Sequence, residues 1–268
     1  MLHILNYERP QTLEEAYQLR QKKGSAVLGG TGWLRLGEHT LRTAIDLSGL
    51  GLRYIREEGE AFSIGAYTTL RDLETDERLN AAFDGAFREA VQAIVGVQFR
   101  NCATLGGSVY GRFGFSDILT LLLSLHCEVH LYREGWVPVE IFAARGPEAD
   151  ILTEVRVYKD RRVKILSQRL NANDFPSITA AVSAGADGFR AVIGARPCRA
   201  RIAAGPEAVN QAGAAAFAKK AADAVTYGNG MRGSAPYRRA LAETLVRRAA
   251  LSLMEQEAEY WTDRLPLR

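Results

Sequence analysis

Two glycine pairs, far apart in the chain, place the strongest restriction on its fold. One lies in the segment 28–33 (Leu-Gly-Gly-Thr-Gly-Trp) and the other in the segment 104–108 (Thr-Leu-Gly-Gly-Ser). Adjacent glycines have no Cβ atoms, so the backbone can take positive φ and approach a ligand closely. Consecutive N–H groups in such turns converge on an anion. A single pair is more often a plain tight turn, but two pairs, each beside a threonine, predict a diphosphate held from two sides.

Apolar patterns around these segments predict a mixture of strands and helices over the first 158 residues. A short apolar strand at 25–28 leads into the first segment, and residues 58–60 separate two strands of a predicted hairpin. Apolar residues at helical spacing predict a helix at 86–95. The stretch 116–125 is apolar almost all round, which predicts a buried helix. One glycine segment thus falls in each part of a bipartite region, about 1–50 and 51–158.

The pattern changes after residue 158. Apolar stretches at 163–169, 178–184 and 189–193 predict strands of a separate sheet. An alanine-rich helix at 213–225 and a last helix capped by Ser234 follow them. Strands followed by helices predict an α+β domain that occupies residues 159–268.

Composition and cysteine spacing exclude several classes of protein. The net charge is only +3 over 268 residues and the basic residues are scattered, so nothing favours nucleic-acid binding. Cys102, Cys127 and Cys198 form no C-x-x-C pair, so we expect no iron–sulfur or zinc framework within this chain. The chain has neither a signal-peptide pattern nor the roughly 20-residue apolar run that spans a bilayer. We therefore expect no membrane span and a cytoplasmic location.

At the glycine segments the chain resembles the flavin-binding (medium) subunits of the molybdenum hydroxylases, the family of xanthine dehydrogenase and aerobic carbon monoxide dehydrogenase. That family carries an A-G-G-T-D/S-L-like first loop, an R-N-x-A-T-I/L-G-G-N/S second loop and, soon after, an Asp that opens an apolar helix. Here segments 28–33 and 100–108 and Asp117 match these motifs. The resemblance implies an α+β fold. A two-part FAD-binding domain of the PCMH type, residues 1–158, would precede a smaller α+β C-terminal domain like that of carbon monoxide dehydrogenase flavoproteins, residues 159–268.

The resemblance also implies which residues contact FAD. Thr104 and Ser108 would hydrogen-bond phosphate or ribityl oxygens, and Asp117 would accept a hydrogen bond from a sugar hydroxyl. Asp117 can also simply favour the positive end of the helix that follows it. The residues predicted to bind FAD are Leu28, Gly29, Gly30, Thr31, Gly32, Trp33, Ile94, Asn101, Thr104, Leu105, Gly106, Gly107, Ser108, Asp117 and Leu152.

Three points in this set stay open. Ile94 and Leu152 match family positions near the isoalloxazine or adenine ring, and they can equally be ordinary core residues. Asn101 can instead hold its own turn. The family also places a basic residue near the flavin ring, early in the C-terminal domain, and neither Lys164 nor Arg169 aligns with it.

The function implied by the resemblance is that of an oxidoreductase subunit that relays electrons and has no catalytic residue or metal of its own. Noncovalently bound FAD would take electrons from [2Fe-2S] clusters in a small partner subunit and pass them to an acceptor such as NAD⁺, oxygen or a quinone. The molybdenum cofactor would lie in a large partner subunit, within a dimer of heterotrimers. Two alternatives remain: a self-contained FAD oxidase, or an assembly subunit that has lost FAD. Gly32, which replaces a polar residue of the family pattern, keeps the last one open.

Overall fold

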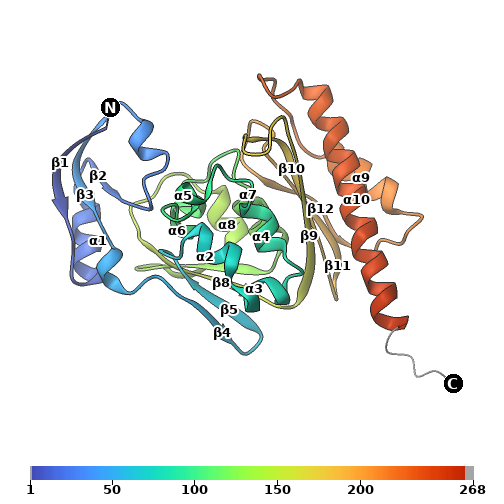
Figure 1. The fold of residues 1–268 in the computed structure, drawn as a ribbon, viewed down its shortest axis with the longest axis horizontal. Helices are drawn as coiled ribbons and strands as arrows, with labels where there is room; N and C mark the ends of the chain where they lie inside the picture. The colour runs from blue at the N-terminus through green and yellow to red at the C-terminus, as the bar shows by residue number, and fades with distance from the viewer. Residues whose placement is uncertain (1, 263–268) are drawn as a thin grey trace.

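A computed structural model describes residues 2–262 of the chain, with side chains up to Glu255. Three β-sheets lie side by side along the long axis of the molecule (Figure 1). Along the chain, strands and short helices of the first two sheets precede the strands of the third sheet, and two helices follow these. Among the described residues, no helix is long and apolar enough to span a bilayer.

The N-terminal sheet is small and parallel, with the strand order β1-β3-β2. The helix α1 covers it, and Thr12 caps this helix by accepting a hydrogen bond from the Glu15 N–H. The sequence analysis did not predict β1, whose residues are all exposed. The elements are β1 (His3–Glu8), α1 (Leu13–Gln21), β2 (Ser25–Val27), η1 (Leu34–Leu36), β3 (Thr40–Ile45) and η2 (Ser48–Leu50).

The central sheet is antiparallel and has five strands, in the order β4-β5-β8-β6-β7. The predicted hairpin forms its edge, and buried and half-buried residues alternate along β6. Short helices connect the strands (Figure 1). The elements are β4 (Ile55–Glu58), β5 (Ala61–Gly65), α2 (Leu70–Thr75), α3 (Glu77–Ala82), α4 (Ala86–Val91), α5 (Val97–Arg100), α6 (Leu105–Tyr110), α7 (Asp117–Ser124), β6 (Cys127–Leu131), β7 (Gly135–Pro138), α8 (Val139–Ala144) and β8 (Leu152–Tyr158).

The helix α7 lies at the centre of the main core. All eight of its residues are buried, and Ser116 caps it by accepting a hydrogen bond from the Leu119 N–H at 3.1 Å. This confirms the predicted buried helix. The predicted helix at 86–95 is shorter than expected, because α4 ends at Val91 and Val95 takes a positive φ of 52°. That turn brings Ile94 and Val95 to the pocket described below.

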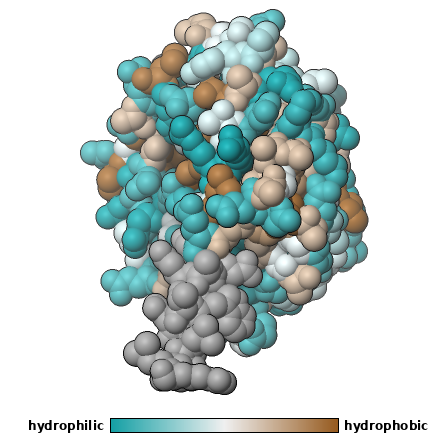
Figure 2. Space-filling view, turned by 90° about the vertical axis from the view of Figure 1, so that its right-hand side faces the viewer, coloured by the Kyte–Doolittle hydropathy of each residue, from teal (hydrophilic) through white to brown (hydrophobic). Residues whose placement is uncertain are grey.

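The C-terminal sheet is antiparallel, in the order β12-β11-β10-β9, and lies between two layers of helices. One face packs on the core around α4 and α7, and the other packs under α9 and α10. The outer side of this end of the molecule is mostly hydrophilic, with scattered apolar residues (Figure 2). The elements are β9 (Arg161–Arg169), β10 (Pro176–Gly185), β11 (Gly188–Gly194), β12 (Arg201–Glu207), α9 (Ala214–Asp223) and α10 (Ala235–Thr262).

The sequence analysis predicted three strands for this sheet, and the structure adds β12. This strand contains Pro206, which argues against a strand because proline cannot donate a hydrogen bond to its neighbour. The position of β12 at the edge of the sheet accommodates the proline, since one side of an edge strand makes no strand contacts. The mixed α and β fold class is therefore confirmed, with one strand missed in each of the two outer sheets.

Candidate cofactor site

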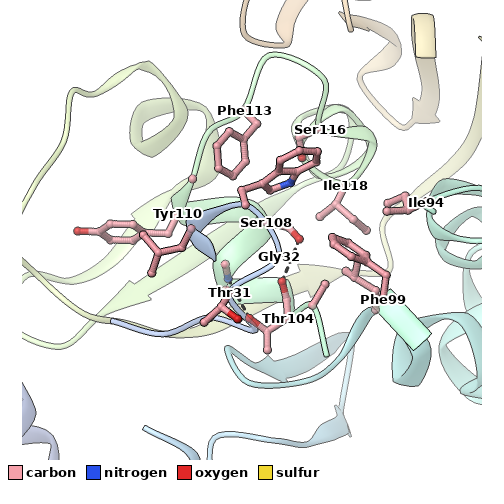
Figure 3. Close-up of a pocket in the computed structure, with 18 of the residues that line it drawn as sticks. Thr31, Gly32, Ile94, Phe99, Thr104, Ser108, Tyr110, Phe113, Ser116 and Ile118 are labelled. Atoms are coloured by element: carbon pink, nitrogen blue, oxygen red, sulfur yellow. Dashed lines mark hydrogen bonds between the residues drawn. The ribbon is translucent and has the colours of Figure 1, made fainter. Parts of the chain in front are cut away.

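The best-formed pocket of the described residues lies where the three sheets approach one another. Its volume is about 380 Å³. The first glycine segment, the start of α6, the start of α7 and the connection between β9 and β10 all line it. Figure 3 shows residues of the first glycine segment, of α6 and of the start of α7 around the cavity. The sequence segments that carried the prediction are thus brought together in one site.

The two glycine segments touch backbone to backbone. A Cβ atom on Gly107 would lie 2.4 Å from the carbonyl oxygen of Gly29, and one on Gly30 would lie 2.0 Å from the carbonyl oxygen of Cys102. A Cβ atom on Gly106 would lie 2.7 Å from the carbonyl oxygen of Ala66. These separations leave no room for any side chain. The glycines therefore close a seam between the N-terminal sheet and the central part of the molecule.

Backbone conformation differs between the two segments, and this corrects part of the prediction. In the first segment, Gly30 has a φ of +80° and Thr31 a φ of 54°. Gly106 and Gly107 instead lie in the first turn of α6 and have ordinary negative φ values. Their lack of a side chain serves the close approach of two backbones and not a left-handed turn. Thr104 caps α6 by accepting a hydrogen bond from the Gly107 N–H at 3.1 Å.

The availability of N–H donors also differs. In the second segment, the N–H groups of Leu105 and Gly106 donate to the carbonyl oxygens of Thr68 and Ala66, both at 2.8 Å. The Ser108 N–H donates to the Thr104 carbonyl at 3.0 Å. The prediction that this segment offers N–H groups to an anion is therefore wrong. In the first segment, by contrast, the backbone N–H groups of residues 29–33 have no acceptor within the described part of the chain.

Tyr67 holds the start of this donor-bearing segment in place. Its hydroxyl donates to the Leu28 carbonyl and accepts a hydrogen bond from the Leu47 N–H at 2.9 Å. Burial raises the pKa of the Tyr67 hydroxyl, so it stays protonated and can make both contacts over the physiological pH range. The sequence analysis did not single out Tyr67, because its two partners lie 20 and 39 residues upstream.

Replacement of Tyr67 by phenylalanine is expected to lower the free energy of unfolding by about 1 kcal/mol, since both backbone groups lose a partner in a half-buried place. Urea denaturation followed by circular dichroism measures this change. Tyr237→Phe is the control, because Tyr237 is 43% exposed at the start of α10. Equal stability of the two variants would contradict the anchoring role of Tyr67.

Asp117 and Arg169 form a buried ion pair at one end of the pocket. Asp117 is 3% exposed; its two carboxylate oxygens accept hydrogen bonds from Arg169 Nη2 and from the Thr179 hydroxyl. Burial raises the pKa of the Asp117 carboxyl, while the adjacent guanidinium acts in the opposite direction. The predicted contact of Asp117 with a sugar hydroxyl thus competes with partners from β9 and β10.

Of the two basic candidates, Arg169 reaches the pocket and Lys164 does not. The Lys164 ammonium lies 3.0 Å from a carboxylate oxygen of Glu89, away from the cavity. Arg169 lines the cavity, and its Nε atom is buried without a hydrogen-bond partner among the described residues. A buried donor without an acceptor is costly in an apolar setting. An unpaired donor on a side chain that lines the cavity makes Arg169 a candidate contact for a bound ligand.

Four aromatic side chains, which we call the aromatic cluster, gather at the same end: Trp33, Phe113, Phe115 and Phe175. Phe113 and Phe115 are stacked, with ring centroids 5.2 Å apart. The Trp33 ring lies 4.9 Å from Phe115 and 5.1 Å from Phe175. Only Trp33 was predicted from the sequence. The pair Phe113 and Phe115, close before Asp117, was a signal that sequence analysis could have used.

The opposite end of the pocket is lined by aliphatic and polar groups. Leu152, Ile151 and Tyr110 lie there, and the Tyr110 hydroxyl donates to the Asp150 carbonyl at 3.1 Å. Ile94 lies on the other side of the cavity, beside Phe99 and Ile118 (Figure 3). The two predicted apolar contacts, Ile94 and Leu152, both line the cavity.

Most of the predicted site residues line the pocket, and four do not. Leu28 directly follows β2, where its N–H donates to the Ile45 carbonyl, and Gly30 faces the backbone of Cys102. Asn101 is exposed at the end of α5, and the side chain of Leu105 is buried in the main core. The predicted residues that line the pocket are Gly29, Thr31, Gly32, Trp33, Ile94, Thr104, Gly106, Gly107, Ser108, Asp117 and Leu152.

Comparison with solved structures supports the fold described above. Quinoline 2-oxidoreductase from Pseudomonas putida 86 matches with a TM-score of 0.82 and 19% identity, over 92% of this chain and 96% of that one. A carbon monoxide dehydrogenase from Hydrogenophaga pseudoflava that lacks the Mo-pyranopterin moiety gives 0.82 and 23%, over the same shares. Reconstituted carbon monoxide dehydrogenase from Oligotropha carboxidovorans gives 0.80 and 24%, over 92% and 96%.

Sequence comparison identifies the family. The uncharacterized protein YgfM of Escherichia coli K12 is 28% identical over 250 residues, which cover 91% of this chain and 94% of YgfM. The family model for the FAD binding domain in molybdopterin dehydrogenase matches residues 3–157, more than half of the chain. This match includes both glycine segments and Asp117, and it confirms the resemblance and the FAD cofactor that those motifs predicted. The chain belongs to the family of FAD-binding domains of molybdopterin dehydrogenases.

Proposed function

We propose that FAD binds in this pocket with its diphosphate against the first glycine segment. The observation that carries the proposal is the row of N–H groups at residues 29–33, which have no acceptor within the described residues; four of these five residues line the cavity. Such a row of donors complements phosphate oxygens. The second segment contributes Gly106 and Gly107, which form a wall of the pocket without side chains. It also contributes the hydroxyl of Thr104 beside this wall.

The two ends of the pocket suit the two ring systems of FAD. The isoalloxazine ring is planar, with an apolar dimethylbenzene end and a polar pyrimidine end that carries two carbonyl oxygens, whereas adenine carries none. The aromatic cluster and the unpaired Nε of Arg169 together suit the isoalloxazine ring. The end lined by Tyr110, Ile151 and Leu152 is then left for the adenosine part. Bound flavin supplies the redox chemistry, and the residues of this chain bind and orient it.

The function that this site supports best is that of the electron-transfer subunit of a molybdenum-containing hydroxylase. Electrons would enter from [2Fe-2S] clusters in a small partner subunit, and the molybdenum cofactor would lie in a large one, within a dimer of heterotrimers. The chain has no C-x-x-C pair, which supports the proposal that a partner subunit holds the iron–sulfur clusters. The carbon monoxide dehydrogenases that share the fold support the complex. NAD⁺, oxygen and quinones are candidate acceptors, and a cytoplasmic location fits this role.

Within this proposal, residues 1–158 form the FAD-binding domain, in parts of about 1–50 and 51–158, and residues 159–268 form the C-terminal domain. Two observations support the boundary. The family match ends at residue 157. The last strand of the central sheet, β8, ends at Tyr158, and the first strand of the C-terminal sheet, β9, begins at Arg161.

The purified full chain is expected to be yellow and to hold noncovalent FAD without iron or molybdenum. An absorbance spectrum, acid precipitation and metal analysis together test this. Flavin colour in the acid supernatant supports the proposal, because the phosphate contacts are reversible hydrogen bonds. Colour retained in the pellet would show a covalent link. A colourless chain that takes up no added FAD would favour the assembly subunit, and rapid bleaching by a hydroxylase substrate in the isolated chain would favour the self-contained oxidase.

A further inference from the structure

The aromatic cluster is fixed in position by a cation from the C-terminal domain. The guanidinium of Arg232 lies 4.9 Å from the centroid of the Phe175 ring. Its Nε and Nη2 atoms donate to the same carboxylate oxygen of Asp174, at 2.9 and 2.6 Å. A carboxylate oxygen of Asp174 also accepts a hydrogen bond from the Phe175 N–H at 2.7 Å. A cation held over an aromatic face favours one ring orientation.

These contacts make the cluster a continuous wall. Phe175 meets Phe115 edge-on, with centroids 4.6 Å apart, and Trp33 contacts both rings. The wall joins the first glycine segment, which carries Trp33, to the start of β10, which follows Phe175. Ile94, Phe99 and Ile118 form another apolar side of the cavity (Figure 3). The end assigned to the isoalloxazine ring is thus bordered by large side chains on more than one side.

Such walls restrict how a second molecule can exchange electrons with the ring. Hydride transfer to or from a nicotinamide needs the reacting atoms about 3–3.5 Å apart in aligned geometry. That geometry requires the nicotinamide to stack face to face on the flavin. Transfer of single electrons between separate carriers has no such contact requirement, and the exposed edge of a ring is sufficient for it.

We propose that the aromatic cluster selects the electron acceptor: it denies a nicotinamide ring face-to-face access, so the subunit serves a one-electron carrier that meets the edge of the flavin. This inference rests on the proposed binding of FAD in the pocket. Reoxidation of the two-electron-reduced flavin then releases two electrons and one proton. Two carriers, or one carrier acting twice, each accept one electron, and the proton on N5 passes to solvent.

Anaerobic reduction of the FAD-loaded full chain tests the proposal with two donors. NADH is the nicotinamide probe, and reduced methyl viologen is the one-electron probe. Two signals are recorded: the bleaching of the flavin absorbance and the long-wavelength charge-transfer band that a nicotinamide stacked on flavin produces. Wild-type protein is expected to show no charge-transfer band. Its flavin should bleach about 100-fold more slowly with NADH than with viologen, because misplacement of the two reacting atoms slows hydride transfer by about this factor.

Trp33→Leu is the test variant and Trp136→Leu its matched control. Trp33 supplies the donor-bearing segment through its backbone, which the substitution keeps, while Trp136 lies on β7 under Arg156, outside the pocket lining. Trp33→Leu is expected to gain the charge-transfer band and to bleach with NADH about tenfold to 100-fold faster. Trp136→Leu should match the wild type. If Trp33→Leu loses FAD, Phe175→Leu, which lies outside the donor segment, repeats the test.

A charge-transfer band and NADH bleaching at the viologen rate in the wild type would overturn the proposal. The same holds if Trp33→Leu and Phe175→Leu both hold FAD and behave as the wild type does. Failure of the proposed function has a different signature. A chain that binds no FAD shows no flavin absorbance before any reductant is added. That result would contradict the proposed binding site and, with it, the proposed role of the aromatic cluster.

Discussion

A Gly107→Val variant is expected to purify folded but without FAD. The Cβ atom of valine would be placed 2.4 Å from the carbonyl oxygen of Gly29, which belongs to the facing backbone and cannot rotate away. The two segments must then separate by a fraction of an ångström or more. Overpacking of this kind costs about 1–3 kcal/mol. If this cost is subtracted from the free energy of FAD binding, the affinity falls roughly tenfold for each 1.4 kcal/mol. The displacement also misaligns the N–H donors of the first segment.

The ratio of flavin to protein absorbance measures FAD content, and circular dichroism shows whether the variant is folded. Gly146→Val provides the control, because a Cβ atom at Gly146 meets nothing within 4 Å and its φ is not positive. The control should retain one FAD per chain. Full FAD occupancy in Gly107→Val would mean that the seam between the glycine segments is not part of the binding site.

Asp117→Ala is expected to lower the free energy of unfolding by about 3–5 kcal/mol, because it leaves the buried guanidinium of Arg169 without its partner. The side chain of Arg169 is only 10% exposed, so water replaces the lost carboxylate incompletely. Urea denaturation of the unloaded chain measures the loss. Glu57→Ala is the control, since the Glu57–Lys159 pair is more exposed and such surface pairs contribute about 1 kcal/mol or less.

A double variant separates stability from ligand binding at this place. Asp117→Leu with Arg169→Met removes both charges, and replacement of a buried pair by apolar residues is often neutral for stability. We expect the double variant to regain most of the stability that Asp117→Ala loses and still to bind FAD more weakly, because the Nε donor of Arg169 is gone. Unchanged FAD affinity in a stable double variant would remove both residues from the site.

The sequence predicts the elements of the site better than its chemistry, and the glycine segments show why. A glycine pair is a local signal for a position where a side chain cannot fit, and both pairs do lie at such positions. Which N–H groups remain free depends on distant partners. The donors of Leu105 and Gly106 are used by the carbonyls of Thr68 and Ala66, which come 37 and 40 residues earlier in the chain. No local pattern in the sequence encodes that pairing.

The alternation of side chains along β9 explains why only one of the two basic candidates lines the pocket. Lys164 and Arg169 are five positions apart on β9, so they point to opposite faces of the strand. The sequence could therefore exclude a shared role, but it could not tell which face met α7. The aromatic cluster was harder to foresee, because its members come from residues 33, 113, 115 and 175 and meet only after all three sheets are in place.

The row of N–H groups without protein acceptors has a thermodynamic consequence. In the unloaded chain these donors must be hydrated, because a polar group without a partner is costly. Uptake of the diphosphate is then an exchange of water for phosphate oxygens at donors whose positions Tyr67 and the glycine seam already hold. Because little of the backbone has to become ordered, most of the heat-capacity change on loading should come from burial of the two ring systems.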